Sequence, residues 1–463
     1  MSCIISAPST DSGKTTLTLL ISCWAYSRGL KLQTFKVGPD YLDQQQLSSI
    51  GQPICRNLDI FLSGENWVKR TFAKYANKAD LSLIEGAMGL FDGLGSTHYS
   101  STANLAKILK LPIIFVVNAK GQAASLLPLI NGFRNYDNKI SIRGVIFNNV
   151  NSERHKVLIK EVFEDQNIEI IGFIPSSKKI ALSKADLGII SPVDSEKKID
   201  VNYFAQFAEK YLDLKVLEKF LLPTNIENNV VKDFQFYFDL KIQRCKPIAI
   251  AEDKIFHFQY PETKEFFHEL GIPLVSWDLF NDKDIPDEAK ILIIPGGFPE
   301  KYANHISSSK RSLESLRKFQ KKGYIYAECG GMMLLGASLT DESGKVYEMA
   351  NIIPFNSKKG KLSIGYRYIK GLNDTQLIKR NQIFKGHEFH YWQIEEESFK
   401  KKFNKDSSLN KFIYPWEIKS WGNQIKNEGW ASNNIHASWM HLHLPSNRCA
   451  AKNFLSIVER FSR

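Results

Sequence analysis

Short apolar runs alternate with longer amphipathic stretches along the first half of the chain. The runs are rich in β-branched residues, and the segments between them are long enough for crossover helices. This alternation is typical of the βαβ units of a doubly wound parallel sheet. The expected strands are Cys3–Ala7, Gln33–Val37, Leu81–Glu85, Ile113–Asn118, Gly144–Asn148 and Glu169–Ile174. Such sheets bind ligands beyond the carboxyl ends of their strands, so we expect functional residues in the loops that follow.

The hydrophobic pattern stops and then restarts in the middle of the chain. A weakly patterned stretch with Pro223 and an asparagine-rich patch extends to Arg244. Beyond it the expected strands are Pro247–Ala251, Leu274–Trp277, Ala289–Ile294 and Gly323–Ala327. We therefore predict an α/β protein with a parallel-sheet domain at 1–212, a connector at 213–245 and a second α/β domain at 246–463.

Composition narrows the classes of protein without choosing one. The 463 residues include 61 Lys and Arg against 49 Asp and Glu, a net charge of +12 that suits nucleic acid, a membrane surface, a polyanionic small substrate or merely a lysine-rich surface. No run approaches the roughly 18 apolar residues of a membrane helix. We expect no signal peptide, because Gly13-Lys14-Thr15 interrupts the apolar stretch near the N-terminus. With six scattered cysteines and no CxxC pair, we expect a cytoplasmic protein without a disulfide framework or structural zinc.

A phosphate-binding loop follows the first expected strand. Residues 7–16 read APSTDSGKTT and precede a segment that can form a helix, as in the Walker A pattern, with Pro8 in place of its first glycine. Glycine lets backbone N–H groups turn towards phosphate, lysine adds a positive charge and the threonine hydroxyl binds Mg²⁺. A plain strand–turn–helix is the alternative. The predicted ATP-binding residues are Ser12, Gly13, Lys14, Thr15 and Thr16.

Four acids follow two neighbouring expected strands. Asp40 and Asp43 lie in GPDYLD, Glu85 ends a strand that resembles Walker B, and Asp92 lies on the loop after it. Hard oxygen ligands suit Mg²⁺, so we predict a metal site of Thr15, Asp40 and Glu85. Four acids exceed what one Mg²⁺ needs, so some would handle an electrophile or an incoming amine. Alternatively, Asp40 is a turn residue and Asp43 a helix cap.

A second candidate site, with a cysteine nucleophile, is predicted in the domain at 246–463. Cys329 lies between an apolar run and two glycines, as in a nucleophile elbow, whose strain would expose the thiol while the following helix favours thiolate. Backbone N–H groups of Gly296 and Gly297 could stabilise an oxyanion. The base is His441 in preference to His443. The sequence GHEFH at 386–390 departs from H-E-x-x-H, so we predict no metal there.

Taken together, the motifs resemble the cobyrinic acid a,c-diamide synthase family over nearly the whole chain and in the correct order. They are APSTDSGKTT, FKVGPDYLD, NLDIFL, EGAMGLFDG, IIPGGFPE, YAECGG, GHEFHY and SWMHLHLPSN. The resemblance implies a P-loop, dethiobiotin-synthetase-like ATP domain followed by a class I glutamine amidotransferase domain. It also implies ATP, L-glutamine and cobyrinic acid as substrates, Mg²⁺ as cofactor and a carbon–nitrogen ligase with glutamine as amido donor.

The resemblance also implies roles for the predicted residues. Cys329 would attack the glutamine amide with His441 as base, and ammonia would displace phosphate from acyl phosphates made in turn on the a and c acetates. Asp40 and Glu85 would hold Mg²⁺ and phosphate. The residues expected on the corrin or the transferring group are Tyr41, Leu42, Asp43 and Asp92.

Four positions depart from the family pattern. Asp11 stands where glycine is frequent, Trp392 replaces a small hydroxyl residue, and an Arg-His pair is blurred in 183–188. His443 stands in the usual place of a triad glutamate, so we expect a Cys–His dyad.

Other interpretations stay open. The macrocycle could be hydrogenobyrinate or nickel-sirohydrochlorin, or other side chains could be amidated, as by cobyric acid synthase. A partitioning ATPase of the ParA/MinD type is a remote alternative. We expect no nucleic-acid or membrane partner, and the oligomeric state is left open, a homodimer included.

Overall fold

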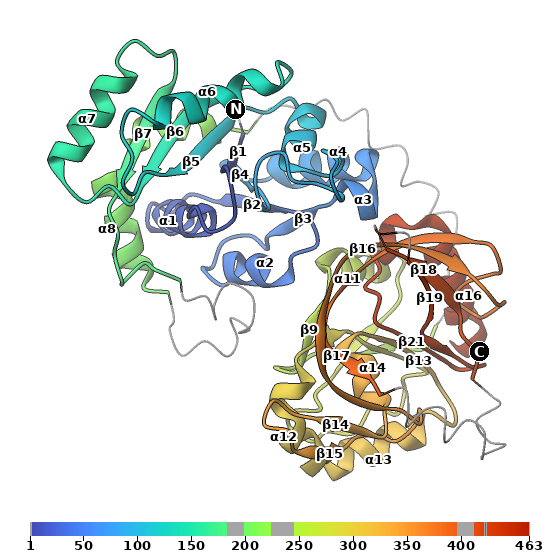
Figure 1. Ribbon diagram of the computed structural model, residues 1–463. Helices are drawn as coiled ribbons and strands as arrows, with labels where there is room; N and C mark the ends of the chain where they lie inside the picture. The colour runs from blue at the N-terminus through green and yellow to red at the C-terminus, as the bar shows by residue number, and fades with distance from the viewer. Residues whose placement is uncertain are drawn as a thin grey trace. The chain divides into compact units, whose positions relative to one another are not determined.

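The computed structural model describes residues 2–182, 199–223, 245–395, 412–420, 422 and 424–462. The chain forms two compact units, Met1–Lys232 and Asp233–Arg463 (Figure 1). Among the described residues, no helix has both the length and the apolar character that crossing a membrane requires.

The first unit is built on a seven-stranded sheet with the order β3-β2-β4-β1-β5-β6-β7. All of its neighbouring strands are parallel, as the βαβ pattern predicts. Buried Val, Ile, Leu and Phe side chains fill these strands, because helices cover both faces of the sheet. The strands are β1 (Cys3–Ser6), β2 (Leu32–Val37), β3 (Arg56–Leu58), β4 (Leu81–Glu85), β5 (Ile113–Asn118), β6 (Ile142–Asn148) and β7 (Glu169–Ile174).

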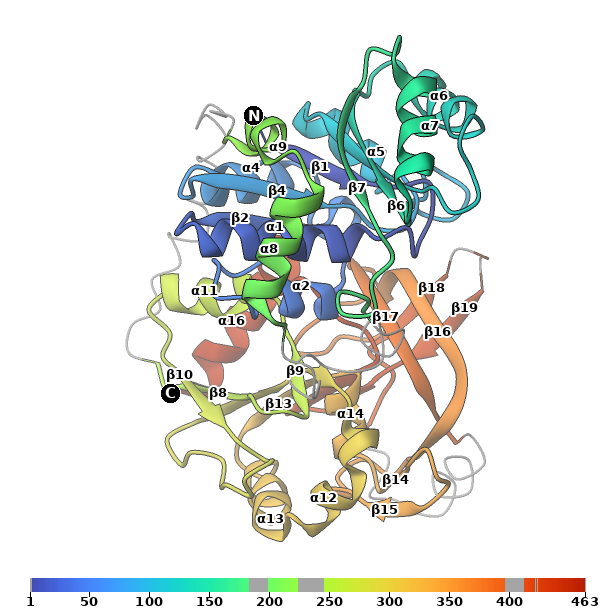
Figure 2. The same ribbon diagram turned by 90° about the vertical axis from the view of Figure 1, so that its left-hand side faces the viewer.

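Two hydrophobic cores lie on opposite faces of this sheet. Helix α1 packs beside α8 on one face, in front of the sheet in Figure 2, and α9 contributes to the same core. Helices α4 to α7 contribute to the other core. The helices are α1 (Lys14–Ser27), α2 (Tyr41–Ser48), α3 (Ile60–Ser63), α4 (Glu65–Ala76), α5 (Thr102–Leu109), α6 (Leu126–Tyr136), α7 (Glu153–Phe163), α8 (Val201–Tyr211) and α9 (Leu214–Leu221).

The second unit has a mostly parallel sheet of order β10-β8-β11-β13-β21-β20, in which only the pair β20–β21 is antiparallel among the described strands. The strands are β8 (Ile248–Ala251), β10 (Leu274–Trp277), β11 (Ile291–Ile294), β13 (Tyr324–Glu328), β20 (Trp430–Ala431) and β21 (Ile435–Ser438). The helices are α11 (Pro261–Glu269), α12 (Ala303–Ser308), α13 (Lys310–Phe319), α14 (Gly330–Leu335) and α16 (Arg448–Ser462). A two-stranded ladder joins β9 (Phe256–Phe258) to β12 (Gly296–Gly297).

A further, largely antiparallel sheet in the second unit was not expected. Its centre is the long pair β16 (Asn356–Gly371) and β17 (Ile383–Ile394). The remaining strands are β14 (Ser338–Thr340), β15 (Val346–Glu348), β18 (Trp416–Lys419) and β19 (Ile425–Glu428). One of its strands, β17, passes the predicted cysteine nucleophile.

The predicted α/β class is confirmed, and every expected strand is present with bounds shifted by a few residues at most. The start of the expected connector is part of the first unit, because Leu217 and Leu221 of α9 are buried in that unit's core. Residues 224–244 of the connector and the blurred motif at 183–188 lie outside the described residues.

Candidate functional site

The phosphate loop joins β1 to α1 and requires an unusual backbone at two positions. Gly13 has φ +104°, and a Cβ there would collide with the amide of Asn148, which donates a hydrogen bond of 3.0 Å to the Ser12 carbonyl. Asp11 has φ +60°, in the left-handed region where glycine is favoured. A glycine at this position would adopt the same backbone without strain.

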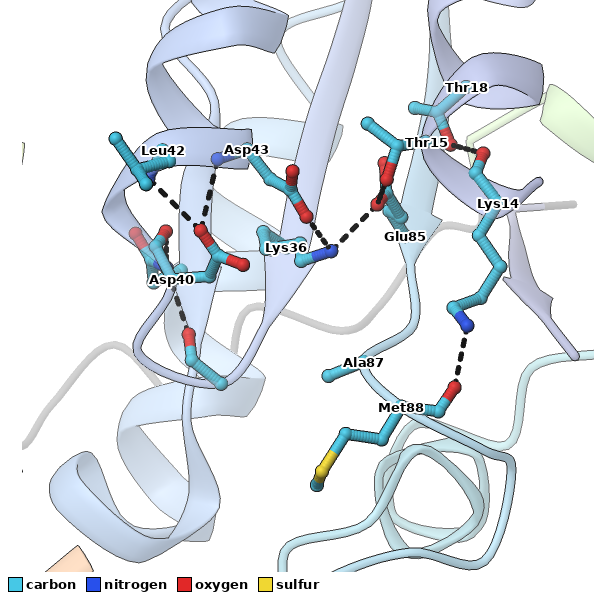
Figure 3. A network of polar contacts seen from close by, with 12 residues as sticks. Lys14, Thr15, Thr18, Lys36, Asp40, Leu42, Asp43, Glu85, Ala87 and Met88 are labelled. Atoms are coloured by element: carbon cyan, nitrogen blue, oxygen red, sulfur yellow. Dashed lines mark hydrogen bonds and ion pairs between the residues drawn. The ribbon is translucent and has the colours of Figure 1, made fainter. Parts of the chain in front are cut away.

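Lys14, the first residue of α1, is buried and folded over this loop. Its ammonium donates hydrogen bonds to the carbonyl oxygens of Met88 at 2.6 Å (Figure 3) and of Ser9 at 3.0 Å. Burial, together with the nearby Lys36, lowers the pKa of Lys14 to about 8. A phosphate would replace carbonyl oxygens that already hold this ammonium in place.

Lys36 joins the two neighbouring strand ends. From β2, its ammonium forms ion pairs with Asp43 and, at 2.6 Å, with Glu85 at the end of β4 (Figure 3). Thr15 donates a hydrogen bond of 2.7 Å to the same Glu85 oxygen. Burial lowers the pKa of Lys36, but the carboxylates outweigh it and hold this pKa well above its usual value. Burial raises the pKa of Glu85.

Asp40 is the N-cap of α2. One of its oxygens accepts hydrogen bonds of 3.0 Å from the backbone N–H groups of Leu42 and Asp43. Burial and the neighbouring Asp43 raise the pKa of Asp40 to about 7. The alternative that made Asp43 the helix cap is wrong: Asp40 caps α2, whereas Asp43 lies in the first turn and pairs with Lys36. Tyr41 is buried at the start of the same helix.

Among the described residues, Asp92 forms no ion pair with Lys36. Its carboxylate turns back to accept a hydrogen bond of 2.9 Å from the backbone N–H of Gly89, so it stabilises its own glycine-rich loop. Of the four predicted acids, the fold brings Asp43 and Glu85 onto one lysine and gives Asp40 and Asp92 backbone partners.

The residues at the P-loop fit a magnesium ion that is shared with a phosphate. The Oε2 atom of Glu85 is buried and has no hydrogen-bond partner among the described residues, while the Thr15 hydroxyl lies on Oε1. No group of three or more His, Cys, Asp or Glu side chains in the described ranges could hold a metal alone. Mg²⁺ needs only one or two protein carboxylates when phosphates and water supply the rest.

Cys329 forms the elbow between β13 and α14. Its backbone has φ +48° and ψ −110°, and its N–H donates a hydrogen bond of 2.7 Å to the Ser438 carbonyl. The expectation of an exposed thiol is wrong, since Cys329 is only 3% exposed. Burial, reinforced by the Glu300 carboxylate, raises the pKa of the thiol. A base must therefore take its proton.

His441 lies at this elbow. A Cβ on Gly296 would collide with its ring, and its Nδ1 is 3.3 Å from a Glu328 carboxylate oxygen. His443 instead has Nδ1 at 2.7 Å from the Ser446 hydroxyl, and its ring packs against Tyr260. The geometry thus agrees with the preference for His441 as base, which stays a prediction.

The two glycines predicted at the oxyanion site also lie at the elbow. Gly296 contacts the His441 ring, and a Cβ on Gly330 would lie 2.9 Å from the Gly297 carbonyl oxygen. A Cβ on Gly297 itself would collide with the Ile255 carbonyl. Only glycines allow these backbones to approach so closely.

Strand β17 provides a wall beside the nucleophile. The Phe389 carbonyl is 3.8 Å from Cys329 Sγ, and Glu388 is paired with Arg367 at 2.5 Å. His390 stacks on Trp439. Trp392, which differs from the expected family pattern, is buried and donates a hydrogen bond of 2.6 Å to the Thr340 carbonyl. The GHEFHY motif therefore supports the cysteine site structurally.

Sequence reasoning missed Lys36 and Glu328. Each is the charged residue of a buried strand, and charged residues are seldom fully buried unless paired. That signal was readable, but the identity of the partners was not.

Comparisons with known proteins agree with both halves of this description. Residues 3–187 match the CobQ/CobB/MinD/ParA nucleotide binding domain, and residues 247–449 match the CobB/CobQ-like glutamine amidotransferase domain. Relatives named cobyrinate a,c-diamide synthase include one from Caldanaerobacter subterraneus (34% identical, 99% of each chain covered). Another is from Clostridium acetobutylicum (35%, 96% of this chain and 98% of the relative). A third is from Salmonella typhimurium (31%, 99% and 98%).

Proposed function

Because the chain belongs to the cobyrinate a,c-diamide synthase family of glutamine-dependent carbon–nitrogen ligases, we propose that it amidates the a and c acetate side chains of cobyrinic acid. The observation that carries the proposal is the presence, in one chain, of a phosphate loop facing a carboxylate and a buried cysteine elbow beside an imidazole. Either site alone would fit many reactions.

In the proposed reaction the second unit makes ammonia. His441 takes the proton of Cys329, and the thiolate adds to the side-chain amide carbon of glutamine. Backbone N–H groups near Gly296 and Gly297 stabilise the oxyanion. Ammonia leaves with a proton from the imidazole, and water then hydrolyses the thioester to glutamate.

The first unit activates the acetate. Ser12, Gly13 and Thr16 surround the ATP phosphates, and Lys14 exchanges its carbonyl partners for phosphate oxygens. Thr15 and Glu85 would hold Mg²⁺, with the second carboxylate oxygen of Asp40 as a further candidate; the ion supplies positive charge beside the phosphates. The acetate oxygen takes the γ-phosphoryl group, and ammonia then displaces phosphate to leave the amide.

The α2 region and the loop after β4 are the proposed corrin contacts. Helix α2 begins with Tyr41, Leu42 and Asp43, and Asp43 pairs with Lys36. Asp92 is exposed on the loop after β4. The polyanionic ligands suit the net charge of +12. A cytoplasmic location and a homodimer stay predictions.

Mass spectrometry of the macrocycle tests the proposal. Purified protein with ATP, Mg²⁺ and glutamine should convert two carboxyl groups of cobyrinic acid into carboxamides, each at the cost of one ATP. Parallel reactions with hydrogenobyrinate and with nickel-sirohydrochlorin compare the macrocycles. No ATP-dependent change on cobyrinic acid would overturn the proposed substrate.

A further inference from the structure

Glu328 is the last residue of the nucleophile's own strand, β13, and its carboxylate reaches the proposed base. Oε2 lies 3.3 Å from Nδ1 of His441, and Oε1 accepts hydrogen bonds from the backbone N–H of Leu442 at 3.1 Å and from the Tyr326 hydroxyl at 2.5 Å. One carboxylate thus holds both the imidazole and the backbone next to it. We infer that Glu328 is the positioning residue that makes His441 a base. This inference rests on the proposed glutamine chemistry.

The contact orients the ring. A carboxylate accepts hydrogen bonds, so the Nδ1 facing it carries the proton and Nε2, on the other side of the ring, is the nitrogen that exchanges a proton with the thiol. Tyr326 fixes the carboxylate in turn, because residues two apart on a strand lie on the same face. A chain of three side chains therefore sets the tautomer.

The contact also stabilises charge. Cys329 and His441 are 3% and 1% exposed, so proton transfer between them creates an imidazolium where water cannot stabilise it. His436 shows the cost. Its ring nitrogens have no hydrogen-bond partner among the described residues, and burial alone lowers its pKa to about 3. The negative charge of Glu328, 3.3 Å from Nδ1 of His441, stabilises an imidazolium there electrostatically.

The sequence position explains why this acid was not expected. The residue two places after His441, where a triad glutamate usually stands, is His443. Glu328 precedes the nucleophile by one residue and lies 113 positions from the base. The expected Cys–His dyad thus gains a carboxylate from a different strand.

Glu328→Gln tests the inference, because the amide keeps the shape and removes the charge. Loss of the acid partner in a comparable triad costs up to about 10⁴-fold, so we expect glutamine-dependent turnover to fall by at least about a hundredfold. Turnover with ammonium chloride as donor should stay within about twofold. The acidic limb of the kcat/KM profile for glutamine should move to lower pH, because the imidazolium loses its carboxylate partner. Glu328→Asp should restore part of the glutamine activity.

Glu428→Gln is the matched control. This buried carboxylate accepts hydrogen bonds from the side chains of Trp416 and Ser438 and from the backbone N–H of Trp439. Ser438 and Trp439 belong to the same segment as His441. Its loss should lower stability without moving the pH profile. If Glu328→Gln does not fold, Glu328→Asp is compared instead; its shorter side chain should lower glutamine-dependent turnover below that of wild type while ammonia-dependent turnover persists. The inference fails if the variant used keeps wild-type glutamine kinetics and an unmoved pH profile. The proposed function fails separately, if wild type does not use glutamine or Cys329→Ala still does.

Discussion

The two sites of this chain satisfy their polar groups in opposite ways. In the first unit the cations are held by groups that a ligand would replace or rearrange: Lys14 by two carbonyls, and Lys36 by Asp43 and Glu85. In the second unit the hydrogen bonds between Glu328 and the His441 segment form a buried scaffold that needs no ligand. The first site should therefore respond to the charge of its ligand, whereas the second should respond to the loss of single groups.

The largest effect is expected from removing the nucleophile. Cys329→Ala should lower glutamine-dependent turnover by about 10⁴-fold or more, because the proposed thioester forms on its thiol. Ammonia-dependent turnover should persist, which would separate the two sites functionally. Cys449→Ala, at an exposed cysteine, is the control for the change of residue type. Surviving glutamine use would remove Cys329 from the mechanism.

The next effect comes from Lys36. Lys36→Met leaves two buried carboxylates without their cation, so the free energy of unfolding should fall by about 3 kcal/mol in chemical denaturation. Turnover should fall with both nitrogen donors. Lys107→Met breaks a partly exposed pair with Asp137 and should cost below about 1 kcal/mol. Equal losses of unfolding free energy in the two variants would contradict the conclusion that Lys36 neutralises the two buried carboxylates.

The pH dependence of ATP affinity should expose Lys14. Because its folded pKa is about 8 without ligand, the ammonium is charged at pH 7 and largely neutral at pH 9. Bound phosphate favours the charged form, so affinity should weaken about tenfold between these pH values. Titration of ATP by calorimetry would measure this.

Lys14→Arg provides the matched control. Its guanidinium stays charged up to pH 9, so any affinity it retains should vary little with pH. The same slope in both proteins would assign the pH dependence to another group.

The smallest effect concerns Asp11. Asp11→Ala should destabilise the protein by about 1 kcal/mol because alanine is strained at φ +60°, while Asp11→Gly should not. Both remove a negative charge beside the phosphate loop, so both should tighten ATP binding by a few-fold. Thermal unfolding and ATP titration would separate the two effects. Equal stability of the alanine and glycine variants would contradict the backbone explanation.

Fold prediction succeeded where the pattern was local. The strand Ile113–Asn118 was predicted with its observed bounds, because a buried parallel strand is a nearly continuous apolar run. The pair β16–β17 was missed, because Asn356–Gly371 is largely exposed and rich in lysine and glycine. Such a strand is stabilised by its partner rather than by its own pattern.

The candidate sites divide in the same way. Gly13 and Cys329 were found because the backbone each position needs restricts the residues allowed there. The burial of Cys329 and the role of Asp40 as a helix cap were not foreseen, since both depend on which segments pack around them. The sequence shows Lys36 and Glu328 as charged residues in expected strands, but it does not show which groups they pair with.

The sequence by itself therefore determined the parallel α/β class, the order of the motifs and the residue types offered to each site. Periodicity and turn chemistry act over a few residues, and both are written directly in the chain. Only the tertiary structure decided that Lys36 joins Asp43 to Glu85 and that Glu328 faces His441. Charged groups far apart in sequence become partners only when packing removes water from them, because burial makes an unpaired charge costly.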